Sequence, residues 1–162
     1  MAACHDDAMP SVGDGRAELA VRVRTVGGAC LLVARGQIDV STVPELHLAV
    51  EDALRADGPV VVDLRAVSFL DSTGLHALLV LRQRLTEQSR RLAVACRPDG
   101  AVAMALAVSG TDRIFEVRAT REDAMAAARA VETDSVEGVF DLARRVGAGV
   151  LAEALRHLRT RP

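Results

Sequence analysis

The sequence predicts an α/β domain with a mixed β-sheet of four to five strands, flanked by about four helices and followed by a C-terminal helical extension. Strand-like apolar runs are each followed by amphipathic helix-like runs, which favours this class. The runs that begin at Val60 and Leu92 are almost continuously apolar, as in strands covered on both faces. The first two strand-like runs are close enough to form a hairpin, so the sheet is expected to be mixed.

The first half of the chain contains strong turn and helix-start signals. Its expected elements are strands over residues 19–24 and 29–34, a helix from Thr42 to near Ala56, and a strand from Val60. Gly27-Gly28 separates the two strands as a turn. Thr42 and Glu45 fit a capping box, and Pro44 falls in the first helical turn, where its missing N–H costs little. Leu46, Val50, Ala53 and Leu54 form the expected inward stripe.

The second half continues the alternation. Its expected elements are a helix from Leu75, a strand over 92–96, a helix over 101–108, a strand over 114–117 and a last helix through Val131. The first of these helices has Leu75, Leu78, Leu79, Arg82 and Leu85 at helical spacing as its expected inward stripe. Thr120 with Asp123 is the expected cap of the last helix. Beyond it, apolar stripes between Val136 and Leu158 predict an amphipathic extension. We therefore expect a flexible tail over 1–17, a domain over 18–131 and a helical extension over 132–162.

Composition narrows the function. The formal net charge of −2 gives no global field for nucleic acid or an anionic membrane, and Trp and Tyr are absent, which disfavours base stacking. All 20 basic residues are arginine, which is typical of a GC-rich genome. Cys30 and Cys96 lie in apolar runs and Cys4 in a polar tail, so neither a disulfide framework nor a metal site is expected, and no cofactor is predicted. Without a signal peptide pattern or a membrane span, the expected location is cytoplasmic.

The junction Asp71-Ser72-Thr73-Gly74-Leu75 joins an apolar strand-like run to an amphipathic helix-like run. A serine here lies among backbone N–H groups that have no intrahelical partner, so its hydroxyl could cap the helix or accept a phosphate. A phosphoryl group adds about −1.5 to −2 charges, which the helix dipole tolerates and Asp71 repels. The alternatives are a purely structural N-cap at Ser72 and a cap or loop stabiliser at Asp71.

Three motifs in order resemble those of STAS domains, and within that family those of bacterial anti-sigma factor antagonists. The first runs from Val61 through Asp71-Ser72-Thr73-Gly74-Leu75 to Leu79. Residues 34–39 are similar to the family's strand-end Gly-x-Leu/Ile-Asp motif, and residues 108–115 to its Ser-Gly-Leu-x-x-Ile/Phe motif. The resemblance covers about Leu19 to Ala130.

The resemblance implies partner switching. The unphosphorylated chain binds an anti-sigma factor of the serine kinase type and releases a sigma factor; that kinase phosphorylates Ser72, and a serine phosphatase reverses the reaction. The implied partner-binding residues are Asp39, Asp71, Ser72, Thr73, Gly74 and His76. Thr73 stands where many relatives have a second serine and is a less favoured acceptor, and His76 replaces a residue that is often small.

Two other functional classes compete with this one. A STAS module could sense a small ligand, or support a transport or signalling complex, with Ser72 serving only as a cap. An enzyme is disfavoured, because the sequence has no Gly-rich phosphate loop, nucleophile elbow or paired carboxylates. We therefore expect no catalytic residues, no cofactor and no direct nucleic-acid contact.

Overall fold

Within residues 18–130, the sheet has five strands in the order β1-β2-β3-β4-β5. In this computed structural model, which describes residues 18–130, the strands are β1 (Leu19–Val26), β2 (Ala29–Ile38), β3 (Val60–Leu70), β4 (Leu92–Ala95) and β5 (Glu116–Arg118). The helices are α1 (Val43–Arg55), α2 (Ser72–Glu87), α3 (Ala101–Ser109), the 3-10 turn η1 (Thr111–Arg113) and a helix over 121–130. Only β1 and β2 pair antiparallel, so the predicted mixed sheet is confirmed.

The central strand β3 is buried on both faces over its first half. Val60, Val62 and Leu64 contribute to the larger core under α1 and α2, whereas Val61 packs into a smaller core on the opposite face. This explains the continuous apolar run, because residues that alternate in direction along a strand all meet protein here. Cys30 and Cys96 are fully buried in the larger core, as predicted.

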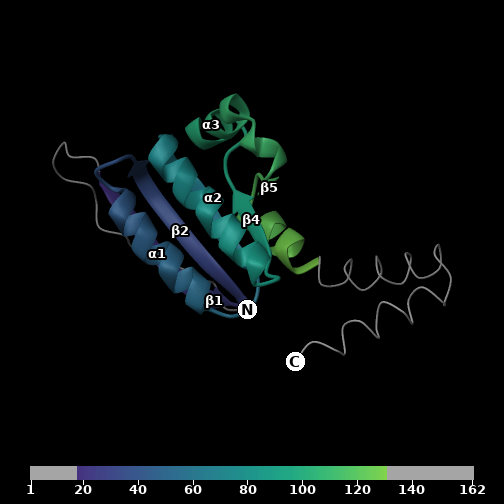
Figure 1. The fold of residues 1–162 in the computed structure, drawn as a ribbon. Coiled ribbons are helices and arrows are strands. Elements are labelled where there is room, and N and C mark those ends of the chain that lie inside the picture. Colours follow the sequence, from purple (N-terminus) through teal and green to yellow (C-terminus); the bar gives the residue numbers. More distant parts are fainter. Residues whose placement is uncertain (1–17, 131–162) are drawn as a thin grey trace, which may run out of the picture.

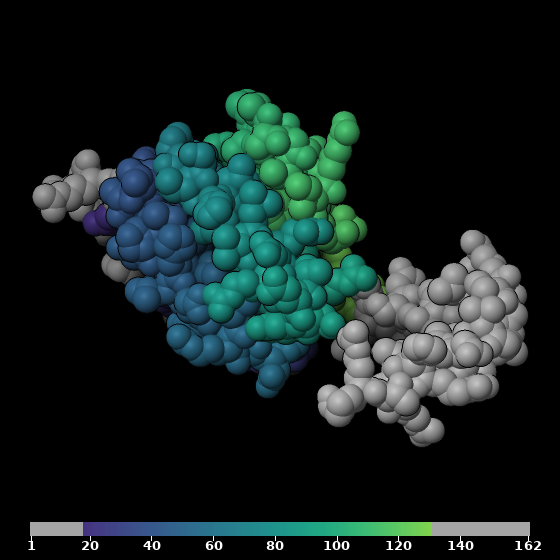
Figure 2. All heavy atoms as spheres, in the orientation of Figure 1, coloured from purple at the N-terminus to yellow at the C-terminus, as the bar shows by residue number. Residues whose placement is uncertain are grey.

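Helices α1 and α2 lie side by side and cover one face of the sheet (Figures 1 and 2). The inward stripe predicted for α1 is confirmed, since all four of its residues are buried. The stripe predicted for α2 is partly wrong: Arg82 is exposed and Leu81 is buried. The helix begins at Ser72 rather than Leu75, and its buried positions follow helical spacing from Gly74.

Two local predictions need correction. The capping box at Thr42 does not form: its Oγ1 accepts from the Asp39 backbone N–H at 3.0 Å and donates to the Gln37 carbonyl at 2.8 Å. The Thr42 hydroxyl therefore stabilises the loop between β2 and α1 and does not cap the helix. The last strand begins at Glu116, because Ile114 and Phe115 follow η1 as a connection in which Phe115 turns into the core.

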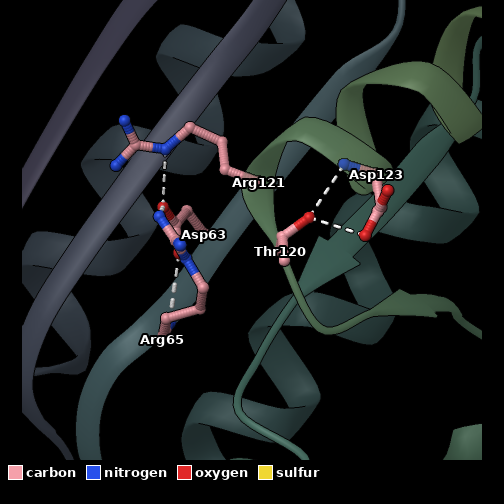
Figure 3. Close-up of polar contacts among 5 residues, drawn as sticks. All are labelled: Asp63, Arg65, Thr120, Arg121 and Asp123. Atoms are coloured by element: carbon pink, nitrogen blue, oxygen red, sulfur yellow. Dashed lines mark hydrogen bonds and ion pairs between the residues drawn. The ribbon is translucent and has the colours of Figure 1, made fainter.

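The opposite face of the sheet is covered by the helix over 121–130. The predicted cap is present: Thr120 Oγ1 accepts from the Asp123 N–H at 3.1 Å and donates to the Asp123 carboxylate at 2.7 Å (Figure 3). Three of its apolar residues pack on the small core of that face, namely Ala124, Met125 and Ala128. On the outer strand of this same face, which pairs with Leu31 and Val33, Arg22 and Arg24 are exposed.

A buried carboxylate fixes this helix to the sheet (Figure 3). The side chain of Asp63 on β3 is 3% exposed and accepts from Arg121 Nε at 2.8 Å. Arg65 forms a two-pronged contact with the same carboxylate, at 3.0 Å from Nε to Oδ1 and 3.0 Å from Nη2 to Oδ2. Burial alone would raise the pKa of Asp63, but the hydrogen bonds from Arg65 and Arg121 outweigh it and hold the pKa below its ordinary value.

The predicted tail over 1–17, the end of the last helix at Val131 and the extension over 132–162 lie outside the described residues. Between residues 18 and 130, none of the helices has the length and apolar character required to cross a membrane.

We predict that Arg121→Met lowers the free energy of unfolding by about 1–3 kcal/mol, because a buried carboxylate loses one charged donor. Asp63 has a depressed pKa in the folded state, so its contribution is present above about pH 4 and is lost as the pH falls. The difference between wild type and variant in urea denaturation should therefore narrow below about pH 4.

The matched control for this prediction is Arg55→Met. Arg55 pairs with Asp52 at 2.8 Å, but both side chains are more than half exposed, at 72% and 60%. Such surface pairs contribute about 0–1 kcal/mol. Equal losses of stability in the two variants would show that the Asp63 contact does not hold the helix to the sheet.

Candidate functional site

The strands β2 and β3 end at the same edge of the sheet. They are parallel and Ile38 pairs with Leu70, so the residues that follow, Asp39 and Asp71, leave the sheet at adjacent points. The backbone N–H of Asp71 donates to the Ile38 carbonyl at 3.0 Å, which joins the two strand ends. The first and second sequence motifs, more than 30 residues apart, thus meet here through the topology of the sheet.

Asp71 is the N-cap of α2. Its Oδ1 accepts from the backbone N–H groups of Thr73 at 2.9 Å and Gly74 at 3.1 Å. These are donors that a helix leaves without intrahelical partners. The alternative in which Ser72 caps the helix is therefore wrong, and the cap reading of Asp71 is confirmed. Ser72 is the first residue of α2, and its side chain is exposed.

The two hydroxyls at the junction differ in their engagement. Thr73 is half-buried, and its Oγ1 donates to Asp71 Oδ1 at 2.5 Å. The Ser72 hydroxyl makes no hydrogen bond to any residue between 18 and 130. A reagent could therefore reach Ser72 without breaking an internal contact, whereas Thr73 would first have to leave its carboxylate partner.

The carboxylate of Asp71 is held in its charged form. Partial burial would raise its pKa, but hydrogen bonds from the Thr73 hydroxyl and from the backbone N–H groups of Gly74, Thr73 and Val40 outweigh burial and lower the pKa. A fixed negative charge thus lies directly beside the Ser72 side chain.

Asp39 closes the loop between β2 and α1. Its Oδ1 accepts from the Ser41 hydroxyl at 2.6 Å and from the backbone N–H groups of Ser41 at 2.8 Å and Thr42 at 3.1 Å. The hydrogen bond from the Ser41 hydroxyl is the largest cause of the lowered pKa of Asp39. The loop is therefore internally ordered, and it presents a second carboxylate at the same edge of the sheet as Asp71.

Gly74 allows α2 to approach the ends of both strands. A Cβ built on Gly74 would lie 2.3 Å from Ile38 Cγ2 and 2.6 Å from Leu70 Cδ1, far inside van der Waals contact. Because Ile38 and Leu70 are buried, neither can move easily. Gly74 thus acts from inside the site, by setting where α2 begins, and is not itself a contact surface.

His76 and two apolar side chains complete the surroundings of Ser72. His76 is exposed and lies four residues beyond Ser72, which places both on the same side of α2. Val40 is 73% exposed and Phe69 is 48% exposed, on the loop and strand that flank Asp71. Sequence reasoning missed this apolar pair. The β2–β3 register shifts opposite Phe69, between Gly36 and Gln37, so simple alternation does not predict that its ring faces outward.

A protein family model and a named relative both match most of this chain. The family model described as the STAS domain matches residues 20–124. The anti-sigma-F factor antagonist RsfB of Mycobacterium tuberculosis is 32% identical over 119 residues, which cover 72% of this chain and 94% of the relative.

Solved structures of anti-sigma factor antagonists have a similar fold. The crystal structure of an anti-sigma factor antagonist from Mycobacterium paratuberculosis is 29% identical, with a TM-score of 0.64, and the match covers 69% of this chain and 95% of that one. The anti-sigma factor antagonist SpoIIAA in its unphosphorylated form shares the fold at 21% identity and a TM-score of 0.58, over 68% and 97% of the two chains.

We predict that Gly74→Ala destabilises the protein, although alanine normally favours a helix interior by about 1 kcal/mol over glycine. The added methyl group overpacks Ile38 and Leu70, which costs about 1–3 kcal/mol and should exceed that gain. Urea denaturation measures the difference. A variant more stable than the wild type would show that α2 does not need this close approach.

Proposed function

The chain belongs to the STAS domain family, and from that membership we propose that it is an anti-sigma factor antagonist switched by phosphorylation of Ser72. Its relatives RsfB and the Mycobacterium paratuberculosis protein are both named as anti-sigma factor antagonists. The observation that carries the proposal is the exposed Ser72 hydroxyl, which makes no hydrogen bond within residues 18–130 and lies beside the capping carboxylate of Asp71.

The proposed partner is an anti-sigma factor with serine kinase activity. In the modification step, the Ser72 hydroxyl oxygen attacks the γ-phosphorus of ATP bound to the kinase. The new bond joins that oxygen to phosphorus, the bond to the β-phosphate oxygen breaks, ADP leaves and the hydroxyl proton passes to a base of the kinase. A serine phosphatase restores the hydroxyl by hydrolysis and releases inorganic phosphate. The antagonist is the substrate in both reactions, so no catalytic residue is assigned to it.

Charge explains how the phosphate would end binding. The carboxylates of Asp39 and Asp71 already lie at this edge of the sheet, and a phosphoryl group adds about −1.5 to −2 charges. Repulsion between unit charges 4 Å apart is about 1 kcal/mol in water but about 4 kcal/mol at an effective dielectric constant of 20. A docked partner excludes water, so it feels the larger penalty and dissociates.

The proposed docking surface combines these charges with an apolar centre. Val40 and Phe69 supply exposed apolar area, and Asp39, Asp71 and His76 supply a polar rim. Ser72 and Thr73 lie between them at the start of α2. Buried aromatic anchors within a polar rim are typical of interface hot spots. We further propose that residues 18–131 form the regulatory domain, with 1–17 and 132–162 as appendages, and that it acts in the cytoplasm, where sigma factors function.

We predict that Ser72→Ala binds the anti-sigma factor without regulation, and that Ser72→Asp binds it at least about tenfold more weakly, which corresponds to about 1.4 kcal/mol. Titration calorimetry with the purified partner measures both affinities, and intact-mass analysis after incubation with kinase and ATP detects the phosphoryl group.

Thr73→Val is the comparison variant, because it removes the neighbouring hydroxyl, together with its hydrogen bond to Asp71, and leaves the Ser72 hydroxyl in place. It should still gain one phosphoryl group, whereas Ser72→Ala should gain none. Phosphorylation of Ser72→Ala but not of Thr73→Val would move the acceptor to Thr73. Equal affinity of Ser72→Ala and Ser72→Asp for the partner would remove the charge mechanism altogether.

We predict that Phe69→Ala weakens binding to the anti-sigma factor by about 1–3 kcal/mol, as expected for truncation of an aromatic anchor. Val26→Ala is the control. Val26 is similarly exposed, at 39% against 48%, but it ends β1 and pairs with Ala29 at the start of β2, which is roughly 30 Å from the site at about 3.3 Å per residue. An unchanged affinity of Phe69→Ala, with its fold intact by circular dichroism, would exclude Phe69 from the interface.

A further inference from the structure

A second concave site lies at the end of α2 remote from Ser72. It is a cleft of about 480 Å³ between the last turns of α2, the start of β4 and the connection from η1 to β5. Figure 1 shows β4 and β5 at the sheet edge beside α2. Its lining residues are Arg82, Thr86, Ser89, Arg90, Arg91, Leu92, Arg113, Ile114, Phe115 and Glu116. The volume falls in the range of small-molecule sites.

The charges around this cleft are unbalanced. None of its four arginines, at positions 82, 90, 91 and 113, forms an ion pair with a carboxylate within residues 18–130. The one lining carboxylate, Glu116, is already paired with Arg118, outside the lining. The negative end of the α2 dipole is equivalent to about half a charge, so it offsets only a small part of this excess.

Two of these arginines are positioned by the fold. Arg90 donates to the carbonyl oxygens of Gly58 at 2.7 Å, Leu54 at 3.1 Å and Ala53 at 3.1 Å, and so closes the end of α1. Arg82 uses its Nε to bind the Ile114 carbonyl at 2.9 Å, which holds its guanidinium group at the cleft. The terminal nitrogens of Arg82, together with Arg91 and Arg113, therefore remain as donors.

The backbone at the rim of the cleft has an unfavourable conformation at Ser89. Ser89 has φ of 55°, and it is the one non-glycine residue within 18–130 with positive φ. It ends α2 in a left-handed turn in which its N–H donates to the Thr86 carbonyl at 3.0 Å and the Arg90 N–H donates to the Leu85 carbonyl at 2.8 Å. Glycine is the usual residue in this position. Serine instead keeps a hydroxyl at the cleft, and retained strain of this kind points to function.

We propose that this cleft binds a compact polyphosphate group, at the level of pyrophosphate or triphosphate. A guanidinium group can donate two parallel hydrogen bonds to two oxygens of one phosphate. Several guanidinium groups around one concave site therefore favour a ligand that has several negative charges. No Trp or Tyr is present to stack a base and Phe115 is buried, so recognition centres on the phosphates. This site goes beyond the proposed partner switch, does not depend on it, and involves none of the residues around Ser72.

Calorimetric titration of the full chain with pyrophosphate, at constant ionic strength, tests the proposal. The variant R91A/R113A should bind at least about tenfold more weakly than wild type, because two charged hydrogen-bonding groups are removed. The control R22A/R24A removes the same charge from two exposed arginines on the outer strand β1, and its affinity for pyrophosphate should be unchanged. No saturable binding by wild type, or an equal loss in both variants, would overturn the proposal.

Ser89→Gly separates binding from folding. It should raise the urea midpoint of unfolding, because glycine adopts positive φ without strain, and yet weaken pyrophosphate binding by loss of the hydroxyl. Unchanged affinity in this variant would remove Ser89 from the site.

Parallel titrations with tripolyphosphate and ATP distinguish the source of the phosphates: similar affinities assign the site to a free polyphosphate, and tighter ATP binding assigns it to a nucleotide.

Discussion

The hydrogen bonds accepted by the Asp71 carboxylate are the contacts on which the site depends. They cap α2 and hold the Thr73 side chain. Because Asp71 caps the helix, the Ser72 hydroxyl has no structural task among residues 18–130. A phosphate on that oxygen would therefore break no internal hydrogen bond. The phosphorylated form that we propose would therefore share one fold with the unmodified form and differ from it in charge.

Strand and helix periodicity was enough to predict the class of fold, the mixed sheet and most of the core. The alternation of Val60, Val61 and Val62 between two cores follows directly from an apolar run in a central strand. The motif at Asp71-Ser72 likewise indicated the candidate site, whose role in phosphorylation and partner binding stays a prediction. Local sequence pattern could not predict which of the two adjacent residues, Asp71 or Ser72, is the N-cap of α2. That choice depends on the Ile38–Asp71 contact between strands, which no local window contains.

The remaining differences have the same origin in tertiary contacts. Phe69 faces outward because the β2–β3 register shifts, and Thr42 leaves the capping box because the Asp39 loop needs its hydroxyl. Asp63 reads as a single polar residue within an apolar strand, and nothing near it in the sequence identifies Arg121, 58 residues away, as its partner. The cleft that contains Arg82, Arg90, Arg91 and Arg113 is built from segments between α2 and β5, so the periodicity of the sequence does not predict it either.

Among residues 18–130, the edge strand β1 pairs with β2 alone, and it exposes Arg22 and Arg24 on one face. A free edge offers unpaired backbone donors and acceptors to any other extended chain. If two copies joined antiparallel through β1, these arginines would meet across the new seam, and directly opposed like charges destabilise strand pairing. Arg22 and Arg24, which serve above as the control pair, thus disfavour the joining of two copies through β1.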